Sequence, residues 1–140
     1  MKNLTINVGD YVRNKYGIAK VVDIENKNDI NILRFDRDIA FMIDREENKE
    51  LYRSNYLPLT EDIDINKINF SSNIIDLIEV GDYVNGEKII RKLNDTFGRR
   101  ILIYGFDDGK HQVANAIYEE DIKSIVTKEM FESLEYKIER

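Results

Sequence analysis

Short runs of β-branched and aliphatic residues, separated by clusters of Gly, Asn and Asp, recur along the whole chain and predict strands rather than helices. The strongest turn signal is Asn85-Gly86, because both residues tolerate the positive φ of a type I′ hairpin turn. One helical turn is expected at residues 128–133, where Thr127 can cap the first N–H groups. The expected strands span residues 10–13, 18–24, 30–35, 39–43, 51–59, 62–66, 87–92, 100–106, 112–118, 122–126 and 134–138.

A five-residue sequence occurs twice without change. Val8-Gly9-Asp10-Tyr11-Val12 returns as Val80-Gly81-Asp82-Tyr83-Val84, and an isoleucine stands two residues before each copy. Self-similarity of this kind indicates that one small supersecondary unit has been duplicated. We therefore predict two small β-rich units, residues 1–70 and 74–140, that join around residues 70–73.

The repeated Gly-Asp-aromatic-Val sequence, placed before a tight hairpin in a unit of short strands, resembles the entry of SH3-like barrels, including those of the KOW type. In such barrels the glycine permits a sharp entry, and the alternation of Val and Tyr turns one side of the strand inward. The resemblance implies a mainly β fold with two SH3-like small barrels or half-barrels. Helices are expected to be short turns at most.

Composition excludes several kinds of site. The chain has 140 residues, of which 34% are charged, a formal net charge of −6 and no cysteine. Disulfides and cysteine metal sites are therefore excluded, and no apolar run reaches the roughly 18 residues of a membrane span. We expect a cytoplasmic protein without a cofactor and without a membrane partner. Direct nucleic-acid binding is disfavoured, because phosphate neutralisation needs clustered Lys and Arg.

Two segments resemble a module found in small uncharacterised proteins of phages that infect low-GC Gram-positive bacteria. The first is residues 73–86, with the sequence NIIDLIEVGDYVNG, and the second is residues 122–132, with the sequence IKSIVTKEMFE. The resemblance implies a phage-encoded protein that acts in the cytoplasm of a bacterial host. It implies no active site.

Residues suited to catalysis or metal binding are few. His111 is the single histidine and is expected to be an exposed residue at the start of a strand, because no nucleophile or orienting partner accompanies it. Asp62, Asp64 and Asn66 have the opening spacing of a calcium loop, but Lys67 stands where that loop needs glycine. We therefore predict a protein that is not an enzyme and holds no metal.

Acidic runs are the strongest surface feature of the first half. A row of carboxylates can occupy an Arg/Lys channel built for nucleic acid. The same charges then steer the protein toward its partner and block the binding of nucleic acid in the channel. Together with the phage resemblance, this predicts an anti-CRISPR-like inhibitor of a bacterial defence system. Its partner would be a host protein or nucleoprotein complex, such as a CRISPR effector nuclease. The residues expected to form this surface are Asp36, Asp38, Asp44, Glu46, Glu47, Glu50, Glu61, Asp62 and Asp64.

Two alternatives stay open. Arg13, Lys15, Tyr16 and Lys20 combine cations with an aromatic ring in the first hairpin, a combination that can pair phosphates and stack bases. This predicts an adaptor that binds host RNA polymerase or nucleic acid through the hairpin, with Arg99-Arg100 as a second contact. The other alternative is a structural or assembly component of the phage particle, which predicts stable higher oligomers and no host partner.

Overall fold

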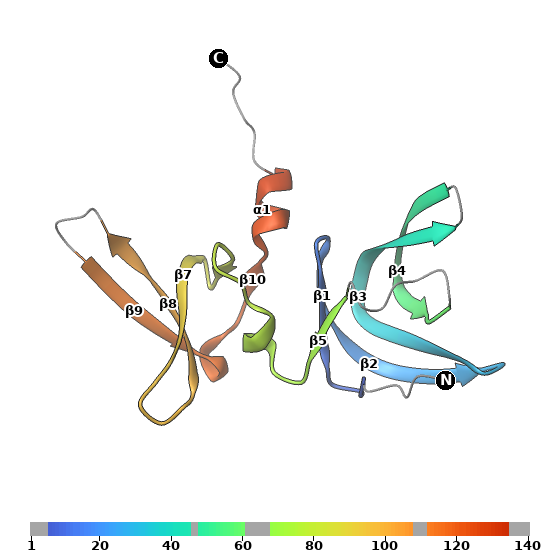
Figure 1. Ribbon diagram of the computed structural model, residues 1–140, viewed down its shortest axis with the longest axis horizontal. Coiled ribbons are helices and arrows are strands. Elements are labelled where there is room, and N and C mark those ends of the chain that lie inside the picture. Colours follow the sequence, from blue (N-terminus) through green and yellow to red (C-terminus); the bar gives the residue numbers. More distant parts are fainter. Residues whose placement is uncertain (1–5, 46–47, 61–67, 108–111, 135–140) are drawn as a thin grey trace, which may run out of the picture. The chain divides into compact units, whose positions relative to one another are not determined.

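The computed structural model describes residues 6–45, 48–60, 68–107 and 112–134. The chain divides into two compact units, residues 1–73 and 74–140 (Figure 1). The described strands form two five-stranded antiparallel sheets, and the described helices are short. The prediction of a mainly β fold with short helical turns is confirmed. Of the predicted strands, residues 62–66 and nearly all of 134–138 lie outside the described residues.

In the first unit the strand order is β4-β3-β2-β1-β5 (Figure 1). Four strands follow one another as antiparallel neighbours, and the fifth returns to pair with the first, where Val12 lies opposite Phe70. This is the strand order of a small SH3-like barrel, in which the return of the last strand brings the sheet toward closure. The strands are β1 (Tyr11–Asn14), β2 (Gly17–Lys27), β3 (Ile30–Arg45), β4 (Asn48–Pro58) and β5 (Asn69–Ser71).

The second unit has the same order, β10-β6-β7-β8-β9, with β6 in the place of β1 and β10 in the place of β5. A 3-10 helix, η2 (Ile74–Leu77), precedes the first strand, and another, η3 (Glu119–Asp121), links β9 to β10. An α-helix, α1 (Lys128–Leu134), follows the last strand. The strands are β6 (Tyr83–Val84), β7 (Glu87–Asn94), β8 (Arg100–Asp107), β9 (Gln112–Tyr118) and β10 (Ile125–Val126).

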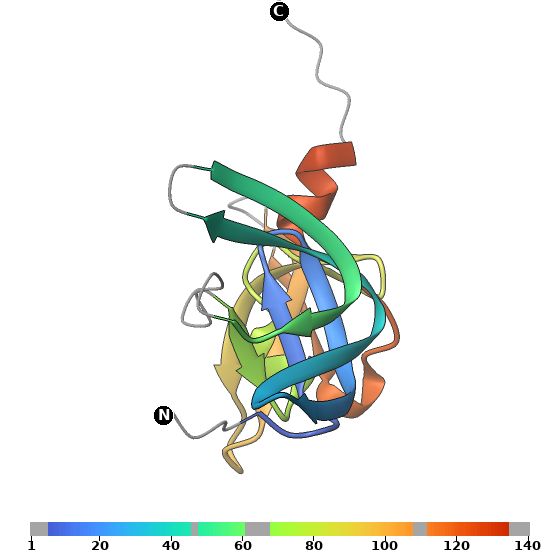
Figure 2. The ribbon, with the colours of Figure 1, turned by 90° about the vertical axis from the view of Figure 1, so that its right-hand side faces the viewer.

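Strand β3 pairs with β2 through its first half and with β4 along most of its length, and a bulge interrupts its pairing with β4. Arg34 lies opposite Tyr56 and Ile39 lies opposite Ser54, so residues 35–38 face a single residue of β4. Bulges of this kind bend and twist a strand. Figure 2 shows β3 curving as it passes from the side of β2 to the side of β4. The predicted break after residue 35 is therefore a bulge within one strand.

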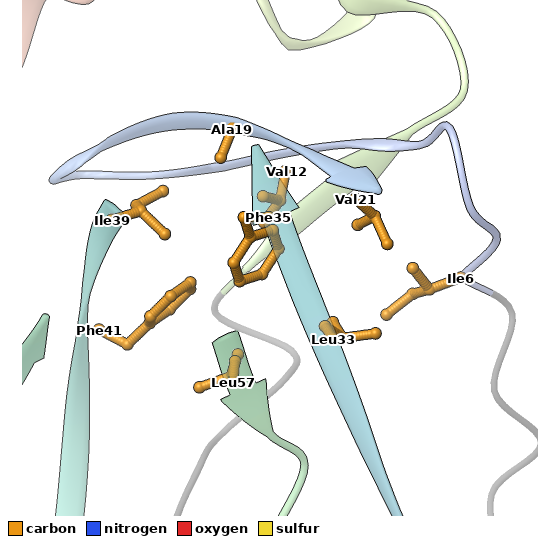
Figure 3. Packing of buried hydrophobic residues seen from close by; sticks show 9 residues of the cluster. All are labelled: Ile6, Val12, Ala19, Val21, Leu33, Phe35, Ile39, Phe41 and Leu57. Carbon is orange, nitrogen blue, oxygen red and sulfur yellow. The ribbon is translucent and has the colours of Figure 1, made fainter. Parts of the chain in front are cut away.

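The core of the first unit lies on the inward side of the curved sheet. Phe35, the first residue of the bulge, and Phe41, beyond it, stack with their ring centroids 5.5 Å apart. Alternating inward residues of the other strands surround these rings (Figure 3). The buried cluster consists of Ile6, Val12, Ala19, Val21, Leu33, Phe35, Ile39, Phe41 and Leu57.

Strand β10 is shorter than the predicted strand at residues 122–126, because the Asn85 side chain forms hydrogen bonds with the backbone of residues 121–124. Asn85 Oδ1 accepts the N–H of Lys123 at 2.8 Å and that of Ser124 at 3.1 Å. Its Nδ2 donates to the carbonyl of Asp121 at 2.8 Å. The φ of Asn85 is +54°, as the predicted type I′ turn requires, so one residue makes the turn and also fixes the entry to β10.

The repeated glycine forms the same turn in both units. Gly9 has a φ of +98° and Gly81 a φ of +100°, a backbone conformation that glycine adopts without steric cost. The Gly9 N–H donates to the carbonyl of Val21, and the Gly81 N–H donates to that of Ile89, each at 2.8 Å. Each turn thereby fastens the start of a unit to its second strand.

The repeated aspartate closes the same turn and has gained a further contact in the second unit. Asp10 accepts the N–H of Asn7 at 2.9 Å, and Asp82 accepts the N–H of Glu79 at 2.7 Å. Asp82 is fully buried and also accepts the N–H of Lys128 at 2.8 Å, whereas Asp10 is half-buried. The second copy of the aspartate therefore ties the beginning of α1 to the turn.

Helix α1 is capped and packed against the same turn. The Thr127 hydroxyl accepts the N–H of Met130 at 3.2 Å, so the predicted N-cap is confirmed. The rings of Tyr83 and Phe131 stack with their centroids 4.4 Å apart. The helix is thus anchored by a hydrogen-bonded start and by one aromatic contact within the second unit.

Replacing Asp82 with Ala is expected to lower the free energy of unfolding of the second unit by about 2–3 kcal/mol, because buried N–H groups lose their acceptor. The matched change Asp10→Ala is expected to cost less than about 1 kcal/mol, since water can reach that half-buried turn. Urea unfolding of each variant measures the two losses, and hydrogen exchange at the Lys128 amide reports the contact that Asp82 adds. Equal losses in the two variants would contradict the added role of Asp82.

Candidate functional site

The structure describes part of the predicted acidic surface. The side chains of Asp36, Asp38 and Glu50 are exposed, the first two on β3 and the third on β4. Asp44 belongs to β3 by its backbone and lies opposite Lys49. The remaining predicted members lie outside the described residues: Glu46, Glu47, Glu61, Asp62 and Asp64.

The described carboxylates alternate with cations. Arg37 lies between Asp36 and Asp38, and Lys49 precedes Glu50, with both cations exposed. Asp36 Oδ1 also accepts the N–H of Lys20 at 2.9 Å, so this carboxylate holds β2 to β3 beside the bulge. The described members therefore lie on a surface of mixed charge, and one of them has a structural role.

The first hairpin differs from the predicted basic and aromatic surface. Arg13, on the interior strand β1, is 1% exposed, so its guanidinium is removed from the surface. The Lys15 Nζ lies 5.1 Å from the centre of the Tyr16 ring, and the Lys20 Nζ lies 5.7 Å from that of Tyr11. These are cation–π contacts within the hairpin. The two tyrosine rings of the hairpin are therefore already in contact with a lysine, one at the turn and one at the opposite end of the strand pair.

The other candidate chemistry of the sequence falls largely outside the described residues. His111, Asp62 and Asp64 are all in undescribed segments. Within the described residues, no group of three or more His, Asp or Glu side chains is arranged to hold a metal ion. The described helices include none that is long and apolar enough to cross a membrane.

A surface that the sequence reasoning missed lies at the turn between β7 and β8 in the second unit (Figure 1). Phe97 stands in this turn with 86% of its surface exposed, the largest exposure among the described large hydrophobic residues. The signal in the sequence was an aromatic residue in an otherwise polar turn, between Asp95 and Gly98. Polar residues are usual in such a turn, so an exposed aromatic residue there indicates a surface that contacts another molecule.

The Asp95 carboxylate fixes the backbone of this turn. Its Oδ1 accepts the N–H of Phe97 at 2.9 Å and the N–H of Arg99 at 2.8 Å, and its Oδ2 accepts Arg99 Nε at 3.0 Å. The Asp95 N–H donates to the carbonyl of Arg99, and its own carbonyl accepts the N–H of Gly98, which has a φ of +81°. Phe97 is therefore exposed on a turn with a defined conformation.

The same contacts shift the pKa values of the Asp95 carboxyl and the Arg99 guanidinium. Desolvation is the largest single influence on the pKa of Asp95 and raises it, but hydrogen bonds from Arg99 and Phe97 together lower that pKa below its ordinary value. The hydrogen bond to Asp95 raises the pKa of Arg99. The turn thus holds a carboxylate and a guanidinium that remain ionised over a wide pH range.

Apolar residues extend from Phe97 along the outer face of the sheet. Leu93 lies opposite Ile101, and Ile101 lies opposite Tyr118, so the three side chains form one cross-strand row. Leu93 is 45% exposed, and the Arg99 guanidinium lies 4.5 Å from the centre of the Tyr118 ring. We call Phe97, Leu93, Ile101, Arg99 and Tyr118 the tip surface.

A shallow hollow adjoins the tip surface on the β7–β8 hairpin. Its volume is about 380 Å³, and its lining combines apolar side chains with cationic and amide ones. An exposed aromatic ring, apolar neighbours and Arg at the margin are the residue types enriched in protein–protein interfaces. The residues that line the hollow are Lys92, Leu93, Asn94, Arg100 and Ile101.

Comparison of the chain with protein-family models, with curated proteins and with solved structures finds no match.

Acidification is expected to release the β7–β8 turn only below about pH 4, the ordinary pKa of aspartate. The folded-state pKa of Asp95 is lowered, so its carboxylate contributes stability that is present above the unfolded pKa and lost as the pH falls through the folded pKa. An NMR titration of the Asp95 carboxyl and of the Phe97 amide should give one shared midpoint below about pH 4. Asp95→Asn removes that titration, and a midpoint above this value would contradict the assignment.

Proposed function

We propose that this chain is a non-catalytic binding protein whose second unit contacts a partner protein through the tip surface. The observation that carries the proposal is the exposure of Phe97, 86%, on a turn fixed by Asp95. A large apolar side chain gains free energy when a partner buries it, by about 25 cal/mol per Å² of apolar surface removed from water. Because the turn is already ordered, binding loses little conformational entropy there.

The composition of the tip surface supports a protein partner. Leu93 and Ile101 add apolar surface to the hairpin whose turn carries Phe97, and the Arg99 side chain, 57% exposed, adds a guanidinium in that turn. Asp95 balances that guanidinium, and Asp76 forms an ion pair with Arg100, so the local excess of cations is small. Nucleic-acid binding, in contrast, depends on unneutralised cations that can face phosphates.

A more specific proposal concerns the setting: the chain is a phage-encoded inhibitor of a bacterial defence complex and presents carboxylates to a basic nucleic-acid channel. It is supported by the exposure of Asp38 and Glu50 on neighbouring strands β3 and β4. The adaptor and phage-particle alternatives assign the contact to Lys15 and Lys20 or to self-assembly. These proposals differ in the residues whose replacement weakens partner binding.

Replacing Phe97 with Ala is expected to weaken partner binding about 30-fold, or about 2 kcal/mol, because the variant removes the aromatic anchor. The partner is first captured from a lysate of a low-GC Gram-positive bacterium and identified by mass spectrometry. The dissociation constant is then measured with the purified partner by calorimetry. Leu51→Ala is the control, since Leu51 is also exposed, 57%, but lies in the first unit. An unchanged affinity for Phe97→Ala would exclude the tip surface.

The acidic-surface proposal predicts that the double change Asp38→Lys and Glu50→Lys weakens the same complex about tenfold at low salt, as expected for the loss of two exposed charge pairs. A matched double change, Glu87→Lys and Asp121→Lys, alters the net charge equally at exposed positions of the second unit. Calorimetry at low and high salt compares the two. Equal effects in both variants would assign the change to net charge and exclude the β3–β4 surface.

A further inference from the structure

Strand β9 has an open edge. It is the last strand in the order β10-β6-β7-β8-β9, so β8 pairs with one side and no described strand pairs with the other (Figure 1). Ala114, Asn115 and Ala116 are exposed, so the described part of the chain leaves this edge uncovered. The N–H and C=O groups along such an edge can pair with a further strand.

The sequence of β9 does nothing to prevent such pairing. Gln112–Tyr118 contains no charged residue and no proline, and its pairing with β8 runs without a register shift. The corresponding edge strand of the first unit, β4, has a bulge opposite it and carries the usual protective residues. These residues are Lys49, Glu50, Arg53 and Pro58. Because both units share one strand order, the fold does not impose this difference.

We propose that β9 pairs antiparallel with β9 of a second copy of this chain, about a two-fold axis at Asn115. A two-fold interface requires a surface that is complementary to itself. Asn115 is the midpoint of β9, so pairing about it uses the strand along its full length. In this register Ala114 lies opposite Ala116 of the partner subunit, and Val113 lies opposite Ile117 of the partner subunit.

The chemistry of β9 favours a second copy over an unlike partner. Every cross-strand pair in the proposed register is neutral, so two chains of net charge −6 pair along a strand that itself carries no charged residue. Ala114 and Ala116 lie on one face of the sheet, opposite Gly105 and Ile103 of β8, and their small side chains leave room on that face of the joined sheets. Pairing also gives hydrogen-bond partners to the outward backbone groups of the edge.

Charge variants at the axis test the proposal. Sedimentation of the full chain over a concentration series is expected to show a monomer–dimer equilibrium. Asn115→Lys and Asn115→Asp are each expected to abolish the dimer, because each residue faces its own symmetry mate, and an equimolar mixture of the two is expected to restore it. Asn55→Lys, at an exposed position of β4, is the control and should keep the dimer.

The natural absence of cysteine permits an independent test of the register. Asn115→Cys should form a disulfide-linked dimer with oxidised glutathione, whereas Ala114→Cys, which does not face itself, should form at least about tenfold less. Wild-type chain that remains monomeric throughout would overturn the proposal, as would a dimer that withstands both charge variants. Equal cross-linking of the two cysteine variants would overturn the register at Asn115.

Discussion

Each unit depends on a single turn in which a glycine reaches the second strand and an aspartate accepts a backbone N–H from three residues earlier. The turn decides where β1 and β6 begin, and it thereby places Val12 and Val84 in the two cores, where both are fully buried. A slip of one residue would turn every inward side chain of the strand toward solvent. The pentamer that occurs twice is therefore explained by the turn that each copy must form.

Outside this shared turn, the two units differ in the contacts of the repeated aspartate and in the composition of their edge strands. The same aspartate is half-buried at Asp10, but at Asp82 it is buried under α1 and bonded to the first residue of that helix. The edge strands have also diverged, with charged residues and proline on β4 and neutral residues on β9. Surface function is expected where copies of one fold differ, since the shared residues are already occupied in maintaining it.

Most of the described strands were predictable from the sequence because their signals are local. Strand β5, which lies where a joint between the units was predicted and pairs with the distant β1, was not predicted. Asn85-Gly86 indicated a hairpin because both residues tolerate a positive φ, and Thr127 indicated the start of a helix because its hydroxyl can accept an N–H of the first turn. The burial of Arg13 was not predictable from a local pattern, because one of the two strands that pair with β1, β5 (Asn69–Ser71), is remote in sequence. Phe97 was missed for a related reason: its exposure follows from Asp95 holding the turn, and no periodic pattern reports that.

The two proposed contact regions belong to the same unit, and this has a consequence for binding. A dimer paired through β9 would carry two tip surfaces, each with its own Phe97, because β7, β8 and β9 form one sheet. A partner with two equivalent sites would then bind the second copy at a raised effective concentration, which increases avidity without any new contact. The ordered turn contributes to this effect, since a fixed Phe97 has a defined position relative to the β9 edge of its own sheet. In this arrangement the open edge would raise the avidity of a small contact surface.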